Sequence, residues 1–347
     1  MDRSNFIRRI LWAVTLTLGI VLFGSQVPLA QAGHIVCGAV ILPGTSEVLD
    51  SNVGPCSTNP ALTVDSAKLD LGGFTVSCDG TGTFNGIEVV GKKSKVSNGT
   101  VSDCKDGISV TGEGKNTLER VTSKNNGEDG FDVASDGNKL IGNTAKDNFD
   151  RGFNIAAGAD KNELAGNMAT GNGGTGFHID GANDNKLSGN TAGSNGADGF
   201  NISGGGNKLS GNLADKNQGA GFGIPDGGND NELTYNTASS NTLDDGFIIG
   251  GDGNKLGRNA SFNNSGDGFE ITVVGNDNKL TGNLAVLNAV DGIRIADGGS
   301  NNDVLNNIAM GNSDVDLNDE GACDNTWKKN LFVTDGEGDG PGAGCIQ

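Results

Sequence analysis

Hydrophobic and polar residues alternate in short segments that recur along most of the chain. Residues 131–133 (Phe-Asp-Val) and 177–179 (Phe-His-Ile) each place an apolar residue on both sides of a polar one. Successive side chains of a strand point to opposite faces, so this pattern predicts short strands with Phe and Ile on one face. No segment shows the apolar spacing of a helix, and the density of Gly and Asn disfavours helices. The pattern therefore predicts an all-β protein.

The alternating segments belong to a repeat of about 23 residues. Each begins with a glycine followed by Phe or Ile, at Gly86, Gly107, Gly130, Gly152, Gly176, Gly199, Gly221, Gly246, Gly268 and Gly292. The repeat continues with a turn rich in Gly, Asp and Asn and with the pattern Asn-[Lys/Glu]-Leu-x-Gly-Asn. A period of this size is typical of a solenoid. We expect a coil of two or three short strands per turn, about ten turns in all, stacked about 4.8 Å apart.

Equivalent residues of successive coils should then lie directly above one another. The pattern predicts an interior column of phenylalanines at Phe131, Phe153, Phe177, Phe200, Phe222, Phe247 and Phe269. It also predicts a column of asparagines at one bend, at Asn143, Asn167, Asn190, Asn212, Asn236, Asn259, Asn283 and Asn307. Asn tolerates left-handed backbone angles, and its amide can bond to the Asn above and below, so we interpret this column as structural.

The first residues of the chain have the features of a secretory signal peptide. Arg3, Arg8 and Arg9 precede an apolar run, residues 10–23, and a small-x-small site ends at Ala32. The run is shorter than the roughly 20 apolar residues that span a membrane. We expect residues 1–32 to be removed, leaving a secreted, periplasmic or cell-surface protein without a membrane span.

Charge excludes one class of partner. The 347 residues contain 24 Lys and Arg against 43 Asp and Glu, which gives a net charge of −19. Such an acid excess repels phosphate backbones, so we expect no nucleic acid partner.

The six cysteines lie toward the two ends of the repeat region, and none falls between residues 105 and 322. An even number in an exported chain indicates disulfides. Six cysteines allow 15 connectivities. Consecutive cysteines are separated by about one coil, which favours sequential pairing within disulfide reach: Cys37 with Cys56, Cys78 with Cys104 and Cys323 with Cys345. We therefore divide the chain after the signal peptide into an N-terminal cap with the first coils (33–85), the repeats (86–312) and a C-terminal cap (313–347).

The chain resembles a known family in its repeats, in residues 69–76 (Leu-Asp-Leu-Gly-Gly-Phe-Thr-Val) and in its ending from Asp316 to Ile346. These features are similar to those of secreted right-handed parallel β-helix proteins of the pectin-lyase-like superfamily. The resemblance covers nearly all of the chain after residue 32 and implies a single right-handed parallel β-helix. It leaves the activity open, because the superfamily includes lyases, hydrolases, epimerases, adhesins and non-catalytic surface proteins.

One group of acidic residues suggests a metal site. Asp residues precede many of the repeat glycines, and we interpret most of them as turn formers bonded to backbone N–H groups. Asp106, Glu128, Asp129 and Asp132, however, converge on two consecutive coils, and four neighbouring carboxylates need a cation to stay ionised together. The group is similar to the calcium site of one family of β-helical pectate lyases. That resemblance implies that the four residues hold Ca²⁺ against a uronate carboxylate.

The catalytic base of those lyases has no counterpart here. They use a nearby Lys to remove a proton, whereas Asn154 and His178 follow Asp132 on the outward column. Arg151 is the adjacent cation, so Arg151 and His178 are the candidates for a proton acceptor.

The sequence therefore favours a monomeric extracellular or cell-surface protein that interacts with a glycan, without a complete set of catalytic residues. The first alternative is a calcium-dependent uronate lyase. The second is a structural or adhesive solenoid that binds no defined sugar.

Overall fold

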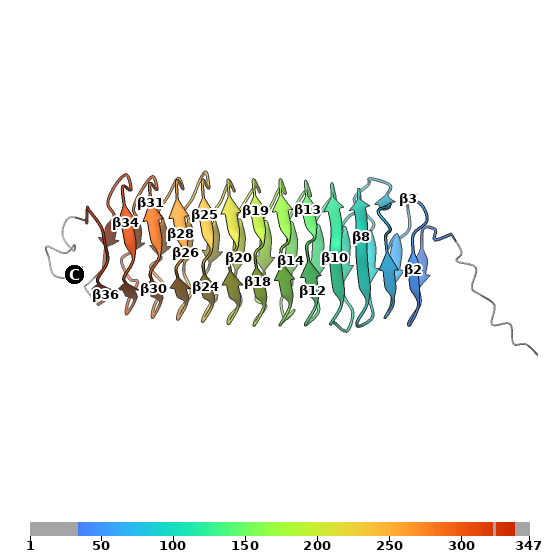
Figure 1. Cartoon of the computed structure of the whole chain (residues 1–347), viewed down its shortest axis with the longest axis horizontal. Coiled ribbons are helices and arrows are strands. Elements are labelled where there is room, and N and C mark those ends of the chain that lie inside the picture. Colours follow the sequence, from blue (N-terminus) through green and yellow to red (C-terminus); the bar gives the residue numbers. More distant parts are fainter. Residues whose placement is uncertain (1–33, 322–323, 337–347) are drawn as a thin grey trace, which may run out of the picture. The chain divides into compact units, whose positions relative to one another are not determined.

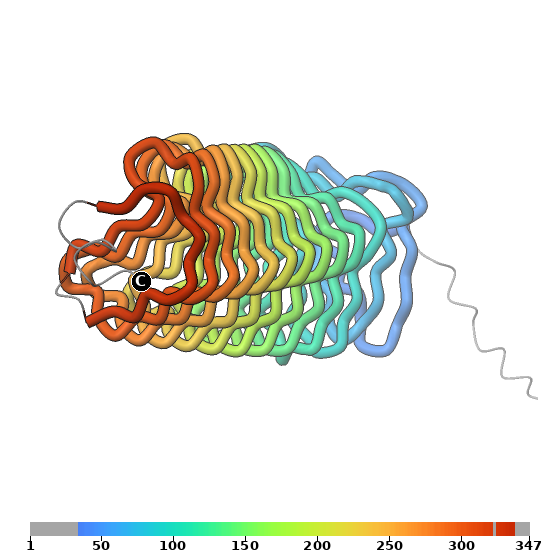
Figure 2. The backbone as a smooth tube through the Cα atoms, turned by 60° about the vertical axis from the view of Figure 1, so that its left-hand side comes forward, coloured from blue at the N-terminus to red at the C-terminus, as the bar shows by residue number. Residues whose placement is uncertain are grey.

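The computed structural model describes residues 34–321 and 324–336. The signal peptide prediction and the third predicted disulfide, between Cys323 and Cys345, lie outside the described residues. All regular structure in the described part is β, and its strands wind into coils stacked along one axis (Figures 1 and 2). No helix that could cross a membrane occurs in this part of the chain.

Three parallel sheets form the walls of the solenoid. The first sheet contains thirteen strands: β1 (Ala39–Ile41), β4 (Leu62–Val64), β7 (Ile87–Val89), β9 (Ile108–Val110), β11 (Phe131–Val133), β14 (Phe153–Ile155), β17 (Phe177–Ile179), β20 (Phe200–Ile202), β23 (Phe222–Ile224), β26 (Phe247–Ile249), β29 (Phe269–Ile271), β32 (Ile293–Ile295) and β35 (Leu317–Asp319).

The second and third sheets share two long strands, β8 (Lys95–Ser102) and β10 (Thr117–Lys124), which run through both. The second sheet also contains β2 (Ser46–Val48), β5 (Lys68–Asp70), β12 (Lys139–Ile141), β15 (Glu163–Ala165), β18 (Lys186–Ser188), β21 (Lys208–Ser210), β24 (Glu232–Thr234), β27 (Lys255–Gly257), β30 (Lys279–Thr281), β33 (Asp303–Leu305) and β36 (Thr326–Lys328). The third sheet adds β3 (Val53–Cys56), β6 (Thr75–Cys78), β13 (Thr144–Lys146), β16 (Met168–Thr170), β19 (Thr191–Gly193), β22 (Leu213–Asp215), β25 (Thr237–Ser239), β28 (Ala260–Phe262), β31 (Leu284–Val286) and β34 (Ile308–Met310).

The number of coils is larger than expected. The thirteen strands of the first sheet mark thirteen coils, against the predicted ten. The sequence count used Gly-Phe and Gly-Ile pairs, and β1, β4 and β35 begin with Ala39, Leu62 and Leu317 instead. These end coils keep an apolar residue at this position but lack the Gly-Phe or Gly-Ile pair, since β1 has Gly38-Ala39, β4 has Ala61-Leu62 and β35 has Asp316-Leu317, so the repeat motif misses them.

The predicted phenylalanine column is confirmed. Strand register places Phe131 on Phe153 and continues without a shift to Phe269. The rings stack with centroids 4.6–4.8 Å apart and planes within 8° of parallel. All seven side chains are buried, and each burial contributes roughly 1.5–3 kcal/mol.

Asparagines form three ladders rather than the one predicted. The predicted ladder is confirmed: the Oδ1 of Asn167 accepts the backbone N–H of Asn143, and the pattern repeats up the solenoid. The second ladder contains Asn116, Asn138, Asn162, Asn185, Asn207, Asn231, Asn254, Asn278, Asn302 and Asn325. The third contains Asn126, Asn148, Asn172, Asn195, Asn217, Asn241, Asn264, Asn288 and Asn312. Each corner of the coil is thereby held by buried side-chain amides.

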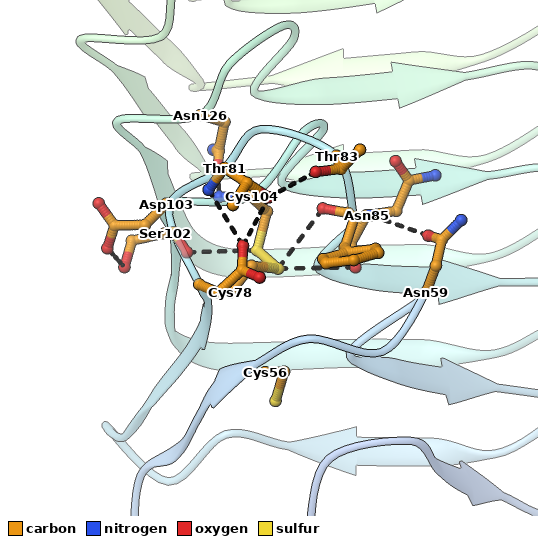
Figure 3. Close-up of a disulfide and its surroundings, with 12 residues drawn as sticks. Cys56, Asn59, Cys78, Thr81, Thr83, Asn85, Ser102, Asp103, Cys104 and Asn126 are labelled. Carbon is orange, nitrogen blue, oxygen red and sulfur yellow. Dashed lines mark hydrogen bonds between the residues drawn. A yellow bond between two sulfur atoms is a disulfide. The ribbon is translucent and has the colours of Figure 1, made fainter.

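Two of the predicted disulfides are confirmed, Cys37–Cys56 and Cys78–Cys104. Figure 3 shows the second, which links the end of β6 to the turn before β9. Asn126, the first residue of the third ladder, accepts the backbone N–H of Cys104 through its Oδ1. The disulfide therefore lies where the regular ladder begins.

Carboxylates close both ends of the described solenoid. Glu47 of β2 occupies the inward register position that Leu69 fills in the next coil, and an inward charge discourages edge-to-edge pairing. At the other end, Asp319 is buried above Ile295 and accepts the indole N–H of Trp327 at 2.8 Å. Asp316 ends the third ladder by accepting bonds from Asn312 and from the backbone N–H groups of 333 and 334.

Candidate functional site

The outward face of the first sheet carries the residues that the sequence singled out. Strand register places Ser109, Asp132, Asn154, His178 and Asn201 in one row, one coil apart. Beside the strands lies a second row, the residues that precede the repeat glycines. The side chains of these two rows form the outward surface of the first sheet, so binding or catalysis on this face would use them.

An aspartate ladder occupies much of the second row. It contains Asp106, Asp129, Asp198, Asp245, Asp267 and Asp291, all of them buried or largely buried. In each case the Oδ1 accepts a backbone N–H of the following coil, at 2.5–3.2 Å. The prediction that these residues bond to backbone N–H groups is confirmed, although the partner lies one coil away rather than in the same turn.

Burial makes these carboxyl groups hard to ionise. It raises the pKa of Asp129 to about 7, that of Asp245 to about 8 and that of Asp267 to about 6. The pKa values of the other three members are also raised, mainly by burial. Repulsion between neighbouring coils adds to the effect at Asp245, whose nearest charged neighbour is Asp267.

We therefore expect stability to fall as pH rises through this range. Because the folded pKa values lie above the unfolded value of 3.8, the unfolded chain releases protons first, from pH 4 upward. The stabilisation that protonation gives is lost progressively up to about pH 8, so the thermal midpoint should drop by several degrees between about pH 5 and pH 9. Asp245→Asn keeps an oxygen for the N–H of Asp267 and should flatten the profile, whereas exposed Asp226→Asn should leave it unchanged. A midpoint that rises over this interval would contradict the assignment.

The four acidic residues of the predicted calcium site do lie on neighbouring coils, but each has another partner. Asp106 and Glu128 pair with Lys105 at 3.3 and 3.0 Å. Asp129 approaches Arg151 at 3.8 Å, and Asp132 accepts the amide of Asn154 at 2.9 Å. Within residues 34–321 and 324–336, no group of three or more His, Cys, Asp or Glu is arranged to hold a metal ion. The calcium site thus stays a prediction from the resemblance, without support from the geometry.

His178 and Arg151, the two candidate proton acceptors, lie near enough for the charge of Arg151 to affect the imidazole. His178 is half-buried at the centre of β17, and its pKa is lowered by burial and then by the charge of Arg151. The imidazole is therefore neutral at pH 7 and offers one donor and one acceptor. Asp150 and Asp180 lie near enough to oppose this shift.

A second arginine on the same face is already paired with carboxylates. Arg294, at the centre of β32, contacts Glu270 at 2.6 Å and Glu320 at 2.9 Å. Arg151, by contrast, approaches only Asp129 among the described residues, and that carboxyl has a pKa near 7. Arg151 is therefore the cation of this face that an incoming anion or hydroxyl group can use.

Sequence reasoning missed Phe149, which lies two residues before Arg151 and is 79% exposed. The following coils carry glycines beside it: a Cβ on Gly173 would lie 2.2 Å from the carbonyl oxygen of Phe149, and one on Gly174 would lie 2.5 Å from Asp150. Close backbone packing thus excludes side chains from this shelf and leaves the ring uncovered. A phenylalanine outside the Gly-Phe motif was the signal that could have revealed it.

Comparison with solved structures shows which proteins share this fold. A search of curated proteins by sequence gave no match. Among solved structures, a double mutant of the periplasmic alginate epimerase AlgG matches with a TM-score of 0.61 and 14% identity, over 85% of this chain and 79% of that one. The unmutated AlgG structure gives 0.56 and 13% over the same shares. At these identities the likeness concerns the fold alone.

The family model described as "Right handed beta helix region" matches residues 66–192 and 178–332. These two matches overlap and follow the three-sheet coils from β5 to β36. The parallel solenoid with its stacked interior columns is the architecture that this description names. Because the matched residues make up well over half of the sequence, the chain belongs to the right-handed β-helix family.

Proposed function

We propose that the protein is an exported glycan-binding protein and that it binds the glycan at Phe149, Arg151 and His178, on the outward face of the first sheet. The observation that carries the proposal is the exposed ring of Phe149 beside a shelf without side chains. An apolar surface next to a few fixed polar groups is the usual make-up of a small-molecule or sugar site.

The three side chains supply complementary contacts. The ring of Phe149 offers a flat apolar surface for the C–H face of a sugar. Arg151 offers several donors in a plane, suited to a carboxylate or to vicinal hydroxyl groups. Neutral His178 adds one donor and one acceptor on the neighbouring strand. The open face of a parallel sheet lets a linear polymer extend over several coils.

Two further observations support the setting. Two disulfides are stable in an oxidising compartment, which agrees with export. The AlgG structures, which share the fold, are those of a periplasmic enzyme whose name refers to alginate, an acidic polysaccharide.

The test is binding of the purified protein to polygalacturonate, alginate and neutral glycans, measured by calorimetry. We expect Phe149→Ala and Arg151→Ala each to weaken binding about tenfold or more, because each removes about 1.4 kcal/mol or more of contact energy. Leu243→Ala is the matched control: Leu243 is 76% exposed near the same corner, several coils away, and its loss should have no effect.

The same assays distinguish the alternatives. Binding that EDTA abolishes would support the calcium site of Asp106, Glu128, Asp129 and Asp132, and calcium-dependent release of unsaturated uronates would replace the proposal by the lyase. Equal weakening by Leu243→Ala would place the site elsewhere. Absence of binding to every glycan would leave the structural or adhesive solenoid as the function.

A further inference from the structure

The outer face of the third sheet changes character in its last coils. From β13 to β25 the two outward rows are mostly polar or small, with Thr144, Lys146, Thr170, Thr191, Gly193, Asp215, Thr237 and Ser239, and Met168 and Leu213 are their isolated apolar members. From β28 onward the same two rows become apolar, as strand register shows. We call this the C-terminal apolar face and define it by Phe262, Leu284, Leu287, Ile308, Met310 and Leu331. These six side chains are 38% to 60% exposed.

The repeat itself does not require this surface. Earlier coils fold with Thr, Lys, Gly, Ser or Asp at all but two positions of these rows, Met168 and Leu213, so the repeat does not need apolar residues there. Strands β28, β31 and β34 lie side by side (Figure 1), and Leu331 extends the row through a bridge to Ile308. A contiguous apolar surface on a chain of net charge −19 marks an interaction site.

The chain beyond the described residues is a poor match for this surface. Residues 337–347 contain Ile346 as their only large aliphatic residue. The last described residue, Gly336, donates its N–H to the carbonyl oxygen of Leu317 in the first sheet rather than to the third sheet. Six exposed large side chains therefore call for a partner with a matching apolar surface.

The charges at the margins indicate which partner fits. Across residues 258–263, 282–290, 306–314 and 329–331, the charged residues are Arg258, Lys329 and Asp314. Arg258 and Lys329 precede the strands of the face, and Asp314 follows them, so the basic and acidic margins lie on opposite sides. Rotation by 180° about an axis parallel to the solenoid brings the basic margin of one copy onto the acidic margin of the other. Rotation about the perpendicular in-plane axis would oppose like charges.

From this complementarity we infer that the protein forms a two-fold dimer, in which two copies pack side by side through their C-terminal apolar faces. The interface is isologous and closed, so association stops at two copies. This proposal differs from the monomer that the sequence analysis expects, and it is independent of the glycan site proposed on the first sheet.

Sedimentation velocity of the exported protein over a range of concentrations tests the dimer. We expect twice the mass of one chain. The variant Leu284→Thr, Ile308→Thr, Met310→Thr should raise the dissociation constant at least about 100-fold. Threonine occurs naturally in both rows, at Thr191 and Thr170, so the variant should keep its fold and melting profile. As a matched control, Met168→Thr with Leu213→Thr changes exposed residues outside the face and should leave the mass unchanged.

A charge exchange tests the arrangement separately. Asp314→Arg alone should weaken the dimer about tenfold, and adding Lys329→Asp, which lies near the same coil level, in the same chain should restore it. A monomeric natural protein overturns the proposal, whether residues 337–347, another protein or a membrane covers the face. A dimer that persists in the threonine variant, or a charge exchange that restores nothing, overturns it as well.

Discussion

Phe177→Ala is expected to lower the free energy of unfolding by about 3–5 kcal/mol. The ring is completely buried, and it stacks between Phe153 and Phe200 at 4.7 and 4.8 Å. Its removal leaves a cavity in the middle of a column that neighbouring coils cannot close, because ladders on three corners fix the spacing. Chemical denaturation followed by circular dichroism measures the change.

His178→Ala, in the same strand, is the control for this prediction. His178 points outward, and its loss should cost under about 0.5 kcal/mol. Equal losses for the two variants would mean that the two faces of the strand have been exchanged.

Asn190→Ala is expected to cost about 2–4 kcal/mol. The Oδ1 of Asn190 accepts both the backbone N–H and the side-chain amide of Asn167, and its own amide donates to Leu164 and Asn212. Alanine would leave a buried backbone N–H without a partner in the space where water is excluded. Hydrogen exchange should then increase locally, at the coils on either side of residue 190.

Ser188→Ala is the control for Asn190→Ala, because it tests whether any substitution in this coil lowers the free energy of unfolding by a similar amount. Ser188 is exposed in the same coil, so its removal should change the unfolding free energy by less than about 0.5 kcal/mol. A comparable loss there would contradict a specific role for the amide ladder.

The repeating coils could be predicted because each coil must bury the same apolar positions of its short strands. Alternation fixed which side of each strand is buried, as the Phe131 to Phe269 column confirms. The end coils were missed because their inward residues, such as Leu62 and Leu317, serve the core without the Gly-Phe motif. Two asparagine ladders were missed because Asn is common in turns, so its recurrence alone does not distinguish a surface turn from a buried amide.

The candidate site was only partly predictable. Asn154 and His178 are neighbours in strand register because one repeat of 24 residues separates them, and Arg151 precedes Asn154 by three residues, so the sequence places Arg151 near His178. The raised pKa of Asp129 depends on burial, which a residue in a glycine-rich turn does not reveal. Phe149 and the C-terminal apolar face occupy positions that hold other residue types in most coils. A search for recurring residues does not detect such positions.

Asp316 shows how a chain built from interchangeable coils can define its own length. The side-chain oxygen of each asparagine accepts an N–H from the coil before it. Its amide nitrogen donates to neighbouring residues, so each asparagine provides a bond for the next one in the ladder. A carboxylate accepts on both oxygens but has no N–H to donate, and the second oxygen of Asp316 accepts the backbone N–H groups of residues 333 and 334, which lie in the following coil. The exchange of an amide nitrogen for an oxygen thus ends the third ladder. A repeat duplicated before Asp316 would extend all three ladders, whereas a repeat inserted after it would have no third ladder to join.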